Sequence, residues 1–157
     1  MLGGKWTYRS YRNATALVGD DAAAALALIF GEGVFDLTQD GAGQVCGALD
    51  MGTDYALTIS GTVNSSDDGD APPVFALIGL GIDGTPTAGW RYDYRGIPAY
   101  SWPDGVNQIP CLVGTVVRVY AHGPGAPAGV TASFVAVDQP DTPSTAQPGG
   151  GAPIAGS

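Results

Sequence analysis

The chain has 157 residues, of which 45% are hydrophobic and only 13% are charged, and its formal net charge is −9. This length suits one domain with a substantial core. The acidic balance argues against nucleic acid, because phosphate binding needs a basic footprint, and it argues equally against anionic membrane surfaces. The sequence lacks an apolar run of about 18 residues, the length at which a membrane-spanning helix is suspected.

Charged residues are about half as frequent as the roughly 25% that is usual in soluble domains. Lys5, Glu32 and His122 are each the single residue of their kind. Such a chain either has a polar, uncharged surface or covers much of its surface with copies of itself. Several of the strands predicted below are apolar on both faces, so we expect a homo-oligomer.

Alternation of apolar and polar residues predicts eight strands, and an alanine-rich segment predicts one short helix. In chain order the strands are expected at 5–12, 29–37, 43–51, 55–63, 73–82, 88–96, 111–121 and 129–137, and the helix at 19–29. Alanines follow Asp20 and Asp21, and either aspartate suits the helix N-cap. Clusters of Gly, Pro and Asp between the strands are typical of chain reversals.

Short reversals favour antiparallel neighbours, because parallel pairs need long crossovers. We therefore predict an all-β domain over residues 1–137, an eight-stranded antiparallel up-and-down barrel with one short helix between the first two strands. Such a barrel has no sheet edges and has room for side chains or one small ligand. A two-sheet β-sandwich is the alternative. Residues 138–157 are rich in Pro and Gly and predict a disordered tail or a linker.

The cysteines and the single histidine do not form a metal site. Cys46 and Cys111 lie in apolar strand contexts, where a free cysteine packs as a small hydrophobe, and one disulfide between them is the alternative. The segment GLGIDG (79–84) is not followed by the helix that a dinucleotide-binding motif requires. We therefore expect neither a metal nor a cofactor.

The N-terminus lacks an apolar signal segment, so a cytoplasmic location is the default expectation.

The first predicted strand begins with Gly4, Lys5 and Trp6, a G-x-W sequence. In this it resembles the calycin group, the lipocalins and avidins, whose first strand carries G-x-W. The resemblance implies an up-and-down barrel in which Trp6 closes one end and a late-strand arginine, here Arg118, packs across it. The position of the predicted helix differs from that in both families. The chain has no residue-by-residue match to the biotin contacts of avidins, so biotin is not expected.

The segment WRYDYRG (90–96) is the main candidate for a binding surface. Because side chains alternate along a strand, its aromatic and charged residues lie on opposite faces. The aromatic face holds Trp90, Tyr92 and Tyr94, and the charged face holds Arg91, Asp93 and Arg95.

Burying three charges is costly, so we expect the aromatic face to point inward. Together with Trp6 and Tyr8 of the first strand it would form an aromatic wall suited to a partly apolar ligand. One alternative is that these rings fill the interior and leave no room for a ligand. The other is an interior in which Arg91 and Arg95 hold a carboxylate.

Glu32 is the candidate acid or base. It lies in IFGEGVF (29–35), among apolar and glycine neighbours, on the same face as Phe30 and Val34. Burial would raise the pKa of this carboxyl, as general acid–base chemistry at neutral pH requires. The alternatives are an exposed glutamate, or one paired with an arginine such as Arg91 or Arg95. His122, beside a loop rich in Gly and Pro, is expected to be exposed to solvent.

Three functions are compatible with these features. The favoured one is a homo-oligomeric barrel that binds a small, partly apolar ligand on its aromatic wall. The second is a barrel enzyme that catalyses a cyclisation or isomerisation, with Glu32 as acid or base and a tyrosine as hydrogen-bond donor, by analogy with small cyclase barrels. The third is a structural subunit with a filled interior that assembles through apolar outer faces.

Overall fold

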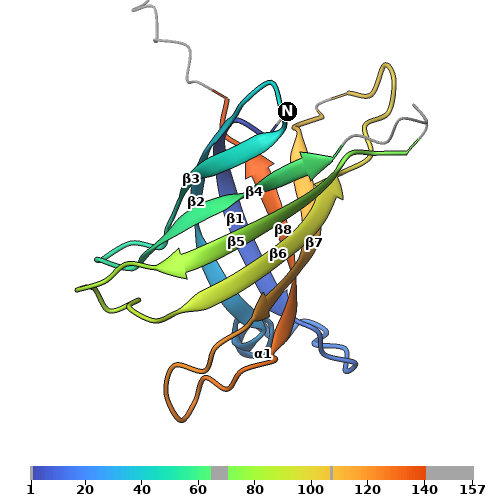
Figure 1. Ribbon diagram of the computed structural model, residues 1–157. Helices are drawn as coiled ribbons and strands as arrows, with labels where there is room; N and C mark the ends of the chain where they lie inside the picture. Colours follow the sequence, from blue (N-terminus) through green and yellow to red (C-terminus); the bar gives the residue numbers. More distant parts are fainter. Residues whose placement is uncertain (1, 65–70, 107, 141–157) are drawn as a thin grey trace, which may run out of the picture.

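The computed structural model describes residues 2–64, 71–106 and 108–140. Eight antiparallel strands form a closed barrel in which each strand pairs with its neighbours in sequence and β1 pairs with β8 (Figure 1). The strands are β1 (Gly4–Arg12), β2 (Ile29–Gln39), β3 (Gln44–Asp50), β4 (Ala56–Asn64), β5 (Val74–Gly81), β6 (Arg91–Pro98), β7 (Cys111–Arg118) and β8 (Thr131–Asp138). The predicted barrel is confirmed, and the β-sandwich is wrong. The predicted tail lies outside the described residues from position 141 onward.

One helix, α1 (Ala22–Ala27), is found in the described part of the chain, and it connects β1 to β2. Asp21 is its N-cap, and the Asp21 carboxylate accepts a hydrogen bond of 3.0 Å from the amide of Ala24. The helix is shorter than predicted because Ile29 already pairs with Tyr11 in the β1–β2 ladder. Within the described segments, no helix has both the length and the hydropathy needed to cross a membrane.

The middle of the barrel is filled by five aromatic rings, which we call the central aromatic cluster. Its members are Tyr8, Phe35, Phe75, Tyr94 and Phe134, each at most 5% exposed. Neighbouring ring centroids lie between 5.0 and 6.2 Å apart, mostly with the edge of one ring against the face of the next. This arrangement is favourable for aromatic pairs. The barrel is therefore packed at its centre, and space for a ligand is restricted to its ends.

The two ends of the barrel differ. At the end that carries the N-terminus, the Trp6 indole is buried and its Nε1 donates a 2.9 Å hydrogen bond to the carbonyl oxygen of Leu2. Leu2 is itself buried, so these two residues plug this end, which we call the N-terminal end. The opposite end, which we call the α1 end, is formed by α1 and by the β3–β4, β5–β6 and β7–β8 connections (Figure 1).

Arg118 lies at the α1 end and not beside Trp6. It is the last residue of β7 and pairs with Tyr92, whereas Trp6 pairs with Asp138 at the N-terminal end. The Arg118 guanidinium carbon lies 4.9 Å from the centroid of the Phe30 ring. Packing of Arg118 across Trp6, as the calycin resemblance implies, is therefore wrong, because β7 starts at the N-terminal end and carries its last residue to the other end.

Both cysteines are free thiols, on strands β3 and β7, which are not neighbours in the barrel. Cys46 is exposed, so the prediction that it packs as a small hydrophobe is wrong. The alternation along β3 turns Val45 inward and leaves Cys46 on the outer face, where its Sγ lies 3.1 Å from the Thr38 hydroxyl.

Candidate functional site

The α1 end of the barrel holds a pocket of about 330 Å³, which we call the α1-end pocket. Tyr8 and Tyr94, from the central aromatic cluster, line its inner part. Apolar side chains of β3 and β4 and of their connection, Leu49, Met51 and Leu57, form one wall. Ligand sites for small molecules typically begin at about 300 Å³, so this pocket has the size needed for one small ligand.

The aromatic face of WRYDYRG points inward, as predicted. Tyr92 and Tyr94 are buried, and Trp90 is half-buried against the core, just before β6. All three line the α1-end pocket together with Tyr8. Trp6 does not join them, because it lies at the N-terminal end. Tyr8 and Tyr94 thus have two roles, since their rings help to fill the middle of the barrel and also line the pocket at its α1 end.

The charged face of WRYDYRG lies on the outer surface of the barrel. Arg91 binds Asp93 through two hydrogen bonds of 3.0 and 3.3 Å, and Arg95 is exposed. An interior lined by Arg91 and Arg95 is therefore wrong. The inward alternative would have required these guanidiniums to lose their hydration inside the central aromatic cluster.

Glu32 and Phe30 lie on opposite sides of β2, against the prediction that they share a face. The β1–β2 register shifts between Ser10 and Tyr11, whose partners are Gly31 and Ile29, so Phe30 is the extra residue of a bulge. The Phe30 ring turns into the barrel and meets Tyr92 edge-on at 6.2 Å. A bulge re-aims one side chain in this way, and sequence alternation does not reveal it.

The Glu32 carboxylate points outward, with 53% of the side chain exposed, and it accepts a hydrogen bond of 3.2 Å from Arg9 Nε. The two residues are cross-strand partners in the β1–β2 ladder. The burial on which an acid–base role depends is therefore not found, and the partner arginine is Arg9 instead of Arg91 or Arg95. Glu32 is nevertheless one of the residues that line the α1-end pocket.

His122 is a site residue that the sequence pattern did not reveal. Its ring stacks on Trp90 with a centroid separation of 3.9 Å and an angle of 14°, and its Nε2 lies 2.6 Å from the hydroxyl of Tyr92. The prediction that His122 is solvent-exposed is wrong, because the β7–β8 connection folds back and places the ring over β6. The amide of His122 bonds the carbonyl of Ala126 at 3.1 Å within that connection.

Three side chains form a hydrogen-bonded chain in the pocket. Arg118 Nε donates to the Tyr92 hydroxyl oxygen at 3.1 Å. Since that oxygen accepts from Arg118, its own proton is directed to His122 Nε2, an assignment made from the hydrogen-bond pattern. Partial burial, and secondly the charge of Arg118, lower the pKa of His122 from its usual 6.5. His122 is therefore neutral at pH 7 and able to accept this hydrogen bond.

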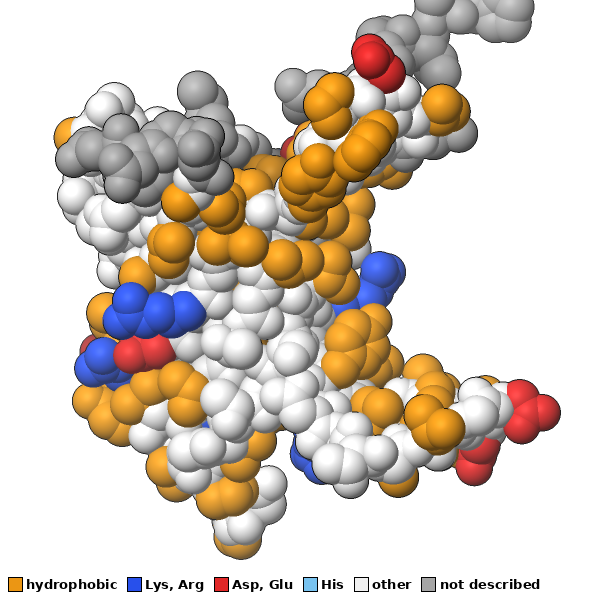
Figure 2. Space-filling model, turned by 90° about the vertical axis from the view of Figure 1, so that its right-hand side faces the viewer, with side chains coloured by type: hydrophobic (Ala, Val, Ile, Leu, Met, Phe, Trp, Pro, Cys, Tyr) orange, Lys and Arg blue, Asp and Glu red, His pale blue; other side chains and the backbone are white. Residues whose placement is uncertain are grey.

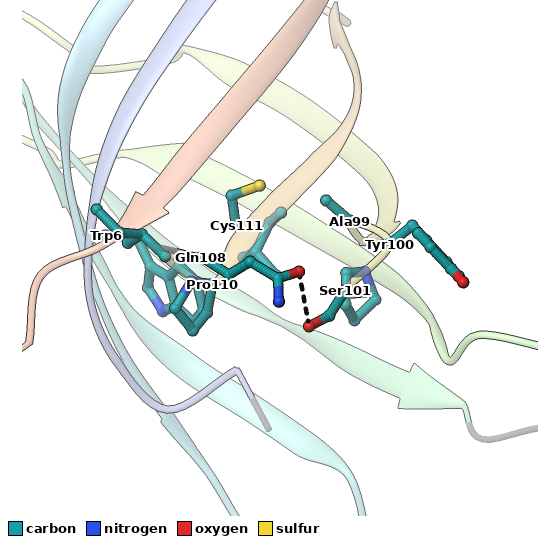
Figure 3. A pocket seen from close by; sticks show the side chains of 10 residues that line it. Trp6, Ala99, Tyr100, Ser101, Gln108, Pro110 and Cys111 are labelled. Atoms are coloured by element: carbon teal, nitrogen blue, oxygen red, sulfur yellow. Dashed lines mark hydrogen bonds between the residues drawn. The ribbon is translucent and has the colours of Figure 1, made fainter. Parts of the chain in front are cut away.

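A second cavity of about 320 Å³ lies at the N-terminal end, between Trp6 and the β6–β7 connection (Figure 3). Trp6 and Tyr100 lie on opposite sides of it, and the Ser101 hydroxyl donates to Gln108 Oε1 at 3.3 Å. Trp6 and Leu2 separate this cavity from the interior of the barrel. Its described lining residues carry no charge, whereas the α1-end pocket is lined by Arg118 and His122.

The site must be interpreted from its own geometry. Neither family models, nor curated proteins, nor solved structures give a match to this chain. In the described part of the chain, no three His, Cys, Asp or Glu residues come together as a metal site would require. What the α1-end pocket offers chemically is an apolar and aromatic lining with one arginine and one histidine that both hydrogen-bond to the same phenol hydroxyl, that of Tyr92.

Proposed function

We propose that the protein binds a small, partly apolar ligand in the α1-end pocket. The observation that carries this proposal is the contrast within the barrel: its centre is filled by aromatic rings, whereas its α1 end leaves a half-open space of about 330 Å³ lined largely by apolar and aromatic side chains. Pockets of this kind, with a few convergent polar groups in an apolar enclosure, are the usual form of a small-molecule site.

The ligand's apolar body would lie between two walls. Leu49, Met51 and Leu57 provide the aliphatic wall, and Trp90 and Tyr92 the aromatic one. Trp90 is positioned for this role by its stack on His122 and by its contact with Tyr55, at a centroid separation of 5.9 Å. A large aromatic side chain at the centre of such a contact commonly supplies much of the binding energy.

Trp90→Ala is expected to weaken binding of N-phenyl-1-naphthylamine, a neutral apolar dye that fluoresces when it leaves water, by about tenfold or more. The indole completes the aromatic wall and stacks on the His122 ring, so its removal opens the pocket further to solvent. Fluorescence titration of the purified protein and the variant measures both dissociation constants.

Trp102→Ala is the matched control. Trp102 is 65% exposed in the β6–β7 connection at the N-terminal end, so its loss should leave the dissociation constant unchanged. If the unaltered protein does not bind the dye, or if both variants lose binding equally, the proposed site is wrong. Absence of binding would instead favour a structural subunit.

We also propose that the protein forms a homo-oligomer through an outer apolar patch. The patch lies on the outer faces of β6, β7 and β8 near the N-terminal end. Its residues are Ile97, Cys111, Val113, Val135 and Val137, which are neighbours by register. Each is only partly buried in the single chain. Figure 2 shows a face with a band of hydrophobic side chains towards the N-terminal end, further hydrophobic side chains towards the opposite end, and few charged side chains. Interface cores are typically depleted of charge.

Val135→Lys should convert an oligomer into a monomer, because it places a charge at the centre of the outer apolar patch, beside Val113. Native mass spectrometry at several protein concentrations measures the assembly. Thr131→Lys, at the other end of the same strand, is the control and should leave the assembly intact. A monomer in the unaltered protein contradicts the proposal.

A further inference from the structure

We propose that the ligand of the α1-end pocket is an apolar acid whose carboxylate is bound by Arg118. This inference rests on the proposed function and adds the chemical class of the ligand. It is carried by a buried arginine that faces the pocket without a carboxylate partner.

Arg118 is only 8% exposed, yet the ion pairs among the described residues do not include it. Its Nε donates to the Tyr92 hydroxyl, and its Nη1 donates to the carbonyl of Pro127 at 3.3 Å. The ring of Phe30 covers one face of the guanidinium. These neutral groups orient the cation but do not neutralise it, and a buried charge without a counter-ion is costly. An anionic ligand would supply the missing charge.

The guanidinium also has donors left for a ligand. Among the described residues, Arg118 Nη2 has no hydrogen-bond partner. Every fully buried side-chain nitrogen or oxygen atom among these residues has a partner, so Nη2 keeps some accessible surface. Arg118 is also one of the residues that line the pocket. Arginine presents its donors in a planar fork that matches the two oxygens of a carboxylate.

The other titratable groups of the pocket do not cancel this charge. Glu32 turns outward to Arg9, and His122 is neutral at pH 7. Burial raises the pKa of Tyr8 and of Tyr94, so both phenols stay protonated. The pocket therefore holds one positive charge within a chain whose net charge is −9. One cation in an apolar enclosure fits a monoanion with an apolar body better than it fits a phosphate, which carries more charge and no apolar surface.

The test compares two ligands of nearly the same shape, naphthalene-2-carboxylate and naphthalene-2-carboxamide, as competitors of N-phenyl-1-naphthylamine at pH 7.5. The carboxylate is expected to bind about tenfold or more tightly than the carboxamide, since a hydrogen bond to a charged partner is stronger than a neutral one. Arg118→Gln should bring the two affinities to within about threefold. Arg95→Gln, which removes an exposed arginine on the outer face of β6, should preserve the preference.

A second measurement needs no variant. His122 is the single histidine of the chain, so the Hε1 proton of its ring gives one histidine signal to follow in an NMR titration. A bound carboxylate close to Arg118 should raise the pKa of His122, and the carboxamide should leave it unchanged.

The outcomes separate the inference from the function on which it rests. The proposal of an acidic ligand is overturned if the carboxylate and the carboxamide bind with equal affinity, if neither displaces the bound dye, or if the preference for the carboxylate survives Arg118→Gln. In each of these cases the proposed apolar site still stands. An acid that leaves the pKa of His122 unchanged also overturns the proposal of an acidic ligand. If the dye itself does not bind, the proposed function fails and the inference fails with it.

Discussion

Phe35→Ala is expected to lower the free energy of unfolding by about 3–5 kcal/mol, a large share of the roughly 5–15 kcal/mol that stabilises a typical domain. Phe35 is 2% exposed and stands at the centre of the central aromatic cluster. Its ring lies 5.0 Å from that of Tyr8 and 5.5 Å from that of Tyr94, both edge-on. The substitution leaves a cavity that strands closed into a barrel cannot easily fill. Urea unfolding, followed by circular dichroism, measures the loss.

Tyr100→Ala provides the comparison for Phe35→Ala. Tyr100 is also aromatic, but it is 81% exposed in the β6–β7 connection, so its removal should change the free energy of unfolding by less than about 0.5 kcal/mol. If Phe35→Ala lowers the free energy of unfolding by less than about 1 kcal/mol, the middle of the barrel is not tightly packed. The conclusion that only the ends of the barrel have space for a ligand would then no longer hold.

Gly81→Ala is expected to destabilise the protein by about 1–3 kcal/mol or more and also to weaken dye binding. A Cβ at position 81 would overlap the carbonyl oxygen of Thr87 and would lie 3.0 Å from the amide nitrogen of Trp90. Thr87 lies in the β5–β6 connection, where it is fully buried and its hydroxyl donates to the carbonyl of Ala56 at 2.8 Å, so moving it disturbs both its packing and this hydrogen bond. The β5–β6 connection must therefore shift, and Trp90 with it. Unfolding and dye titration measure the two effects.

Gly41→Ala is the control for this substitution. Gly41 lies in the β2–β3 turn, where an added Cβ meets no atom within 4 Å. It should leave both stability and dye affinity nearly unchanged. If Gly81→Ala destabilises the protein without changing dye affinity, the β5–β6 connection does not position Trp90, and the aromatic wall is held by β6 itself.

The strands and the direction of their side chains could be predicted because they depend on local pattern. Each predicted strand overlaps a strand of the structure, and Tyr92 and Tyr94 point inward as their period-two spacing requires. The same pattern and the short turns favoured a barrel but left a two-sheet sandwich open, and closure is seen only in the structure, where β1 pairs with β8. The predicted aromatic wall was correct for Tyr8, Trp90, Tyr92 and Tyr94 in so far as all four line one pocket. Their binding role stays a prediction.

The remaining members of the site could not be predicted, because they depend on how segments meet after closure. Phe30 enters the barrel through a shift in strand register, and Glu32 finds Arg9 because β1 lies opposite it. His122 reaches Trp90 through a loop whose path is not encoded in any periodicity.

The sequence by itself determined the number of strands, their order and which faces are apolar, since these depend on the two-residue repeat and on the turn residues between strands. The tertiary structure decided which end of the barrel is open. It placed Trp6 with Leu2 at one end and Arg118 with Tyr92 and His122 at the other. Strand direction and register determine the position of a residue along the barrel axis, whereas alternation determines only whether it points inward or outward.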